Sequence, residues 1–177
     1  MNARRYYKVY GETKAKCEEV LDDYNRMIDA VHSWAMSHGG KGYWREGSRV
    51  SGITIDATKK KPEGWLINKQ YHSPDTAYLK PDKRTKVGKR LETEISGLPN
   101  PFRSNLVGEA FGVGAFVIST QASKCICWLH MERCEGEIIL SVPIANDSFG
   151  DEGVTKFKPD HAEEITYGEY MIMTGQS

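Results

Sequence analysis

Residues 109–144, EAFGVGAFVISTQASKCICWLHMERCEGEIILSVPI, are the densest apolar stretch of the 177-residue chain. β-Branched, aromatic and small residues alternate along this stretch, which is typical of β-strands. Cys134-Glu135-Gly136 supplies a tight turn, because glycine can take a positive φ there. Since the connections are short, we expect an antiparallel meander rather than a parallel sheet, which needs long crossovers. The three predicted strands run over Phe111–Ser119, Lys124–Arg133 and Glu137–Ile144.

The clearest helical pattern covers Thr13–Ser37, where apolar residues recur at spacings of three and four. This spacing indicates a long amphipathic α-helix with one apolar stripe. Thr13 is a suitable N-cap, and the glycines after His38 can end the helix in the left-handed conformation. The stripe consists of Cys17, Val20, Leu21, Tyr24, Met27, Ile28, Val31, Trp34 and Ala35.

Thr85 is the expected N-cap of a second, short helix over Lys86–Ser96. Three further strands are predicted, and the first of them is an edge strand or an addition to the main sheet. A long polar loop with two prolines is expected over residues 68–85, either functional or mobile. The three strands cover Arg5–Tyr10, Arg49–Ile55 and Ile165–Thr174.

These elements predict an α+β fold. The sheet is mostly antiparallel, with about five to seven strands, and the long N-terminal helix packs on one face. Residues 1–177 are expected to form a single domain, since a chain of this length can bury its own core.

The composition, 39% hydrophobic and 27% charged, is that of an ordinary soluble globular protein. No window of about 18 apolar residues occurs, so no membrane span is expected. The N-terminal residues lack the apolar region of a signal peptide, which predicts a cytoplasmic location. The four cysteines do not suggest a disulfide framework in a chain of this length.

The net charge is zero, but the charges are unevenly placed along the chain. Residues 1–103 hold 20 Lys and Arg against 13 Asp and Glu, whereas residues 104–177 hold 4 against 11. This asymmetry predicts separate basic and acidic surfaces, unless the two halves neutralise each other in the fold.

A basic region covers residues 59–90 and is the predicted partner-binding surface. Its cations could neutralise phosphates, with Tyr71 and Tyr78 stacking on bases if the loop presents them. An acidic protein could bind the same cations, and a solvated face without a partner would show the same pattern. The predicted partner-binding residues are Lys59, Lys60, Lys61, Lys83, Arg84, Lys86, Lys89 and Arg90.

A second candidate is a small-ligand or nucleotide pocket near Gly112, Gly114, Ser119 and Glu137. Strand glycines leave the backbone bare for a ligand, although a neighbouring ring or a bulge would also explain them. The paired glutamates of 135–137 and the Ser-Thr of 119–120 resemble the ADP-ribosyltransferase pattern, which implies a nicotinamide site. The competing interpretation is that these glutamates flank a hairpin turn.

Cys125, Cys127, His130 and Cys134 have the residue types of a zinc site. A strand would turn His130 away from the first two cysteines, so buried thiols are expected and no metal or cofactor is predicted. His72, Ser73 and Asp75 could act in acid–base chemistry, but triad members normally converge from distant segments. No catalytic residue is therefore assigned, and His32 is expected to be structural.

RYYKVYGETKAKCEEVLDDYN (residues 5–25) and LKPDKRTKVGKRLETEI (residues 79–95) resemble the small accessory proteins of tailed bacteriophages and prophages. The resemblance covers about half of the chain and carries no catalytic motif, so no functional residue is transferred. It implies a role in redirecting or blocking a host system, in the host cytoplasm.

The leading hypothesis is a non-enzymatic binding protein that occludes a host macromolecule, with a host protein as the expected partner. It would use the basic region, the acidic residues 147–169, or both, with electrostatic steering. The first alternative is a nucleic-acid-binding protein that uses the basic 59–90 region. The second is a small-ligand protein or an enzyme.

Overall fold

The computed structural model describes residues 4–102, 106–112, 116–118, 129–144 and 157–175. The chain forms two compact units. Residues 1–23 and 104–177 make up the terminal unit, and residues 24–103 make up the middle unit. Helix α1 (Gly11–Ser37) contributes its first part to the terminal unit and its second part to the middle unit.

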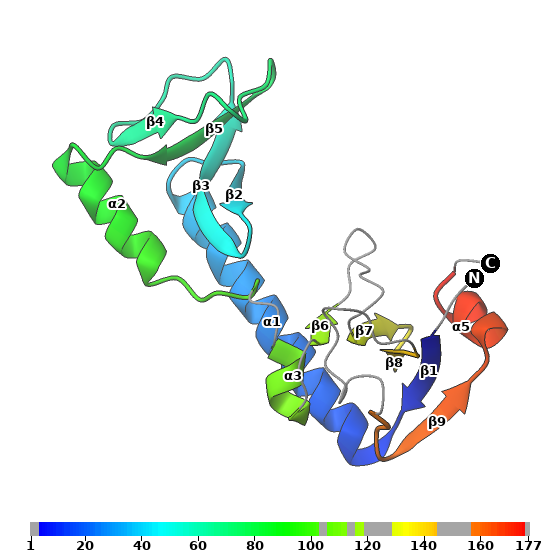
Figure 1. The fold of residues 1–177 in the computed structure, drawn as a ribbon. Coiled ribbons are helices and arrows are strands. Elements are labelled where there is room, and N and C mark those ends of the chain that lie inside the picture. The colour runs from blue at the N-terminus through cyan, green and yellow to red at the C-terminus, as the bar shows by residue number, and fades with distance from the viewer. Residues whose placement is uncertain (1–3, 103–105, 113–115, 119–128, 145–156, 176–177) are drawn as a thin grey trace. The chain divides into compact units, whose positions relative to one another are not determined.

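The terminal unit contains a sheet with the strand order β6-β7-β8-β1-β9 (Figure 1). Every pairing is antiparallel except that of β6 with β7, which is parallel. Two short helices, α3 and α5, also belong to this unit. The elements are β1 (Arg4–Val9), α3 (Leu106–Phe111), β6 (Phe116–Ile118), β7 (Leu129–Cys134), β8 (Glu137–Pro143), β9 (Ala162–Ile165) and α5 (Tyr167–Met173).

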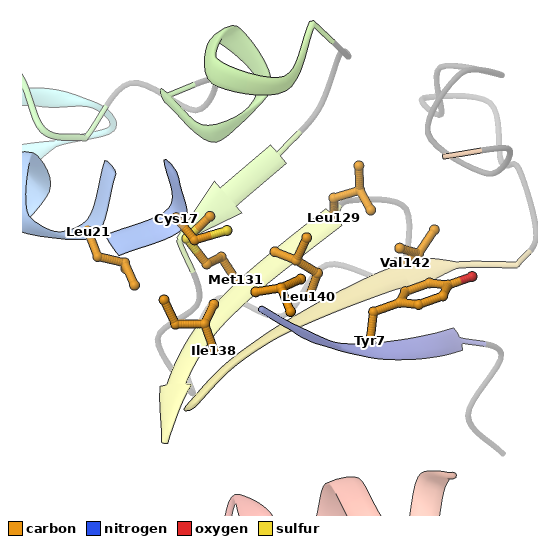
Figure 2. Close-up of a cluster of buried hydrophobic side chains, with 9 residues drawn as sticks. Tyr7, Cys17, Leu21, Leu129, Met131, Ile138, Leu140 and Val142 are labelled. Atoms are coloured by element: carbon orange, nitrogen blue, oxygen red, sulfur yellow. The ribbon is translucent and has the colours of Figure 1, made fainter. Parts of the chain in front are cut away.

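One face of this sheet packs against the first turns of α1 (Figure 2). Cys17 and Leu21 of the helix meet alternate residues of three strands, as the period of two in a strand requires. Burial raises the pKa of the Cys17 thiol to about 12. The strand residues of this core are Tyr7, Val9, Leu129, Met131, Ile138, Leu140 and Val142.

The opposite face of the sheet is covered by α5. Tyr170 stacks on Tyr6 with ring centroids 4.1 Å apart, and its hydroxyl donates to Glu132 at 2.7 Å. Thr166 and Glu169 form a capping box at the start of the helix. The predicted last strand over residues 165–174 is therefore wrong, because the capping box begins a helix directly after β9.

The predicted strand over residues 111–119 is wrong at its start. Phe111 ends α3, and Gly112 follows with a φ of +67°, which is the left-handed conformation common after helices. Strand β6 begins only at Phe116 and pairs with β7 in parallel, so the predicted all-antiparallel meander is also wrong here. Residues 124–128 of the second predicted strand lie outside the described residues.

The β7–β8 hairpin confirms the predicted turn. Cys134 pairs with Glu137, and Glu135 and Gly136 have φ values of +50° and +82°. Two central residues with positive φ define a type I′ turn, which matches the twist of antiparallel strands. Glu135 therefore lies in the hairpin turn and Glu137 directly follows it, which agrees with the hairpin interpretation of this motif.

Strand β1 lies inside the sheet between β8 and β9, so it is an added strand and not an edge strand. Helix α1 begins at Gly11, two residues before the predicted N-cap. The hydroxyl of Thr13 instead donates to the carbonyl of Asp160 at 2.6 Å and ties the helix to the segment before β9.

The middle unit contains an antiparallel sheet with the strand order β2-β3-β5-β4. Helix α2 and the last turns of α1 pack on one face of it, where Ala35 and Leu91 meet Ile53 and Leu79. Trp34 donates to Glu94 at 3.2 Å and joins α1 to α2. The elements are β2 (Gly42–Glu46), β3 (Arg49–Asp56), β4 (Trp65–Ile67), β5 (Thr76–Pro81) and α2 (Lys86–Ser96).

Helix α2 has the predicted bounds, and the hydroxyl of its N-cap Thr85 accepts from the amide of Gly88 at 2.9 Å. The predicted loop over residues 68–85 is wrong in its second half, because β5 occupies Thr76–Pro81. Ala77 and Leu79 are buried against β3. Strand β5 is therefore stabilised by pairing with β3, which precedes the predicted loop in the sequence. Strand β2 is not among the elements that the sequence predicts.

The α+β class and the long N-terminal helix are confirmed. The described strands form a five-stranded and a four-stranded sheet, more than the five to seven predicted in one sheet. The single domain over residues 1–177 stays a prediction. No helix in the described part of the chain is both long and apolar enough to span a membrane.

Candidate functional site

The charge asymmetry of the chain follows the two units. The middle unit holds 15 Lys and Arg against 8 Asp and Glu, a net charge of +7, and the terminal unit holds 9 against 16, a net charge of −7. A domain with such an excess of cations attracts polyanions even when the whole chain is neutral. The middle unit is therefore where a basic binding surface would lie.

The outer face of α2 carries Lys86, Lys89 and Arg90, all exposed. The opposite face of the helix buries Gly88, Leu91 and Ile95. The three cations make no ion pair with any described residue, so their charge is not neutralised locally.

Lys61 and Gly64 lie close to the start of α2, since Arg84 and Lys61 both lower the pKa of Asp82. The amide of Asp82 donates to the carbonyl of Gly64 at 2.8 Å, and a side chain at position 64 would collide with Val87. The backbone of Asp82 approaches Gly88 so closely that a Cβ there would be 1.7 Å from its carbonyl oxygen. The fold thus brings Lys61 and the predicted cations of residues 83–90 to one end of the unit.

Some of these cations are already engaged. Arg84 donates to both carboxylate oxygens of Asp82, at 2.9 and 3.2 Å, which lowers the pKa of Asp82 and raises that of Arg84. Lys83 lies 3.8 Å from Glu92, and the ammonium of Lys61 donates to the carbonyl of Trp65 at 2.6 Å. Lys59, Lys60, Lys86, Lys89 and Arg90 form no ion pair within the described residues, and we call them the free cation group.

The other face of the middle sheet carries Trp44, Tyr71 and Tyr78, and we call it the ring face. The three ring centroids lie between 5.6 and 6.1 Å apart. Tyr78 points away from the α2 side, because its neighbour Leu79 packs in the helix-covered core and side chains alternate along a strand. The free cations of α2 and the two predicted stacking tyrosines therefore belong to opposite layers of the unit.

Sequence reasoning missed Trp44 as a member of this cluster. Its indole nitrogen donates to the carbonyl of Leu79 at 2.8 Å across Gly52. A Cβ at position 52 would lie 2.8 Å from that nitrogen and 1.7 Å from the carbonyl oxygen. The only signal in the sequence is a glycine inside a strand, which marks a close approach without naming the partner.

The predicted small-ligand residues do not form a site in the described structure. Gly112 is exposed at the end of α3, where a Cβ would have no atom within 4 Å, and Glu137 begins β8, 3.9 Å from Lys14. Gly114 and Ser119 lie outside the described residues. A cavity of about 300 Å³ does occur in the terminal unit, but neither Gly112 nor Glu137 lines it.

The other residues proposed from the sequence do not form a catalytic or metal site within the described residues. The hydroxyl of Ser73 donates to Asp75 at 2.9 Å and lowers the pKa of that carboxyl, but His72 is exposed and does not join them. His130 is buried and Cys134 is half-buried, whereas Cys125 and Cys127 lie outside the described residues. His32 is exposed on α1, and its structural role stays a prediction. Within the described residues, no three His, Cys, Asp or Glu side chains could hold a metal ion.

No family model, curated protein or solved structure matches this chain.

Proposed function

We propose that the chain is a non-enzymatic nucleic-acid-binding protein that uses its middle unit. The observation that carries the proposal is the net charge of +7 on that unit, together with the unpaired cations Lys86, Lys89 and Arg90 on the outer face of α2. Cations without an acidic partner can neutralise phosphates and release counterions, which is the main source of sequence-independent affinity. The neutrality of the whole chain does not oppose this function, because the acidic residues are concentrated in the other unit.

Fluorescence anisotropy with labelled DNA and RNA oligonucleotides tests the proposal. Binding by the intact chain should weaken steeply as salt rises from about 50 to 200 mM. Lys86→Gln, Lys89→Gln and Arg90→Gln together should weaken binding and lower the salt slope by about three, since each phosphate contact contributes nearly one. The thermal midpoint should change little, because these side chains are exposed on one helix face.

The matched control removes three cations from the terminal unit, by Lys8→Gln, Lys14→Gln and Lys158→Gln. It changes the net charge of the chain by the same amount but leaves the middle unit intact, so it should bind with wild-type affinity. Equal losses in both variants would show that only total charge matters. Absence of salt-sensitive binding by the wild-type chain would refute the proposal.

The occlusion of a host protein stays a prediction from the sequence. A pull-down from bacterial lysate, with and without nuclease, separates it from nucleic-acid binding. A stoichiometric protein that survives nuclease and is lost with the α2 triple variant would favour the occlusion hypothesis. Recovery that disappears with nuclease would favour the nucleic-acid proposal.

A further inference from the structure

We propose that the ring face binds single-stranded nucleic acid by stacking bases on Tyr71 and Tyr78. This inference rests on the proposed function and specifies its substrate class. The free cation group would bind the backbone of duplexes and single strands alike, whereas the ring face would add affinity for unpaired bases only. The ring face lies on the opposite layer from α2, so its contribution can be measured separately.

The three rings form a supported platform. Trp44 is only 7% exposed and is held by its hydrogen bond to Leu79 in a slot that glycine at position 52 leaves open. Tyr71 and Tyr78 pack against Trp44 at centroid distances of 5.6 and 5.9 Å, while Tyr71 remains 40% exposed. A tyrosine ring that packs against Trp44 on one side and is exposed to solvent on the other loses little conformational entropy when a base stacks on it.

Cations flank the tyrosines. Lys80 follows Tyr78 by two residues in β5, so both side chains leave the same face of the strand. Lys69 is exposed in the loop that carries Tyr71, and neither lysine makes an ion pair within the described residues. Rings with cations beside them are the arrangement with which proteins bind single strands, because every base has a π-face and every nucleotide has a phosphate.

The acidic groups nearby are already engaged. Asp56 lies 3.3 Å from Lys41, whose ammonium also donates to Thr76 at 2.8 Å. Asp75 accepts from Ser73. Asp75 keeps its negative charge, because its hydrogen-bond partner is a neutral hydroxyl. The three lysines Lys41, Lys69 and Lys80 still outnumber Asp56 and Asp75, which favours a polyanion over a cationic ligand.

A duplex cannot use such a platform, because its bases already stack on one another and only its backbone and groove edges are exposed. An oligonucleotide of thymidines lacks stable internal stacking and presents its bases freely. The ring face therefore predicts a preference that the α2 surface alone would not produce.

The test compares an oligo-dT of about 20 nucleotides with a duplex of the same length by anisotropy, in the intact chain and in variants of the two tyrosines. Tyr71→Leu with Tyr78→Leu should weaken oligo-dT binding about tenfold or more and leave duplex binding unchanged, because the leucines remove the π-surfaces on which bases stack. Tyr71→Phe with Tyr78→Phe is the matched control, because it keeps the rings and should retain wild-type affinity.

Near-ultraviolet circular dichroism and the thermal midpoint check that the leucine variant is folded. If it is not, Lys69→Gln with Lys80→Gln provides the second test, and the salt slope for oligo-dT should then fall by about 1.4 with no change for the duplex. Unchanged oligo-dT binding in a folded leucine variant, or an unchanged slope in the lysine variant, would overturn the inference. Binding of both nucleic acids that depends on α2 alone would overturn it while the proposed function stands, whereas failure to bind either would remove both.

Discussion

Each unit contains a sheet and a portion of α1, but the strands that pair in the two sheets come from differently spaced parts of the sequence. In the middle unit all four strands come from one continuous stretch, where β3 pairs with β2 across a short turn and with β5 across the segment that contains β4. In the terminal unit β1 pairs with β8 and β9, so Arg4 lies opposite Pro143. The basic unit is thus local in sequence, whereas the acidic unit depends on pairing between the two ends of the chain.

This difference shows that the two units can carry opposite net charges although a continuous helix joins them at one of their two boundaries. The chain passes between the units twice: the first boundary falls inside α1, next to Tyr24, and the second, between residues 103 and 104, follows the proline-containing segment 99–101. Cys17 and Leu21 on one side of the boundary are buried in the core of the terminal unit, and Ala35 on the other side is buried in the core of the middle unit. Each unit can therefore be perturbed through its own core.

The largest expected effect comes from Gly52→Val in the middle unit. The added side chain would collide with the carbonyl of Leu79 and displace Trp44, so the β3–β5 pairing must open. We expect the free energy of unfolding to fall by about 4 kcal/mol or more, as measured by urea denaturation. Gly97→Ala is the control, because its nearest neighbours would lie at ordinary contact distances of 3.6 and 3.7 Å. A small loss in Gly52→Val would show that the slot for Trp44 is not rigid.

A matched pair of core truncations compares the two units directly. Leu140→Ala in the terminal core and Leu79→Ala in the middle core each remove a fully buried side chain, at an expected cost of about 2 to 5 kcal/mol. Hydrogen exchange read by mass spectrometry should show lost protection only in the unit that carries the substitution, because the two side chains belong to separate core clusters. Loss of protection in both units after either change would show one cooperative domain, as the sequence predicts.

A smaller effect is expected at the start of α5 in the terminal unit. Thr166→Ala removes the hydroxyl that accepts from the amide of Glu169 at 3.1 Å, so stability should fall by about 1 kcal/mol. Thr166→Ser keeps the hydroxyl and should behave as wild type in thermal denaturation. If both variants lost the same stability, the threonine methyl group rather than the cap would be responsible.

The smallest effect concerns pH and belongs to the middle unit. The guanidinium of Arg84 lowers the pKa of Asp82 below its usual value in the folded state. The contribution of this pair to stability is therefore present above the unfolded pKa of about 3.9 and lost as pH falls through the lower folded value. Carbon-detected NMR titration of the Asp82 carboxyl should show this low midpoint, and Arg84→Gln should move it upward. An unchanged midpoint in Arg84→Gln would assign the shift to the backbone instead.

The elements that can be predicted from the sequence are those with local causes. The bounds of helix α2 are predictable because Thr85 caps it and Leu91 and Ile95 repeat at helical spacing. The β7–β8 turn is predictable because Gly136 permits the positive φ that it needs.

The errors have physical reasons. Residues 165–174 are rich in tyrosine and isoleucine, which favour strands. Thr166 and Glu169, however, form a capping box that stabilises the start of a helix. Strand β5 lies in a stretch with a polar composition, and its burial depends on pairing with β3. The cations of α2 can be predicted as an exposed group, whereas the meeting of Trp44 with Tyr78 cannot, because strand order brings them together and periodicity does not reveal strand order.

Because the terminal unit is discontinuous in sequence, the two units cannot fold at the same time during synthesis on the ribosome. Synthesis runs from the N-terminus, so residues 24–103 emerge complete while the partners of β1 in β8 and β9 have not yet been made. We expect the basic unit to be able to reach its native pairing first, and β1 to wait as an unpaired segment until most of the chain has been translated. For an interval of every synthesis, the nascent chain would thus present its cationic unit before its acidic counterpart exists as a folded structure.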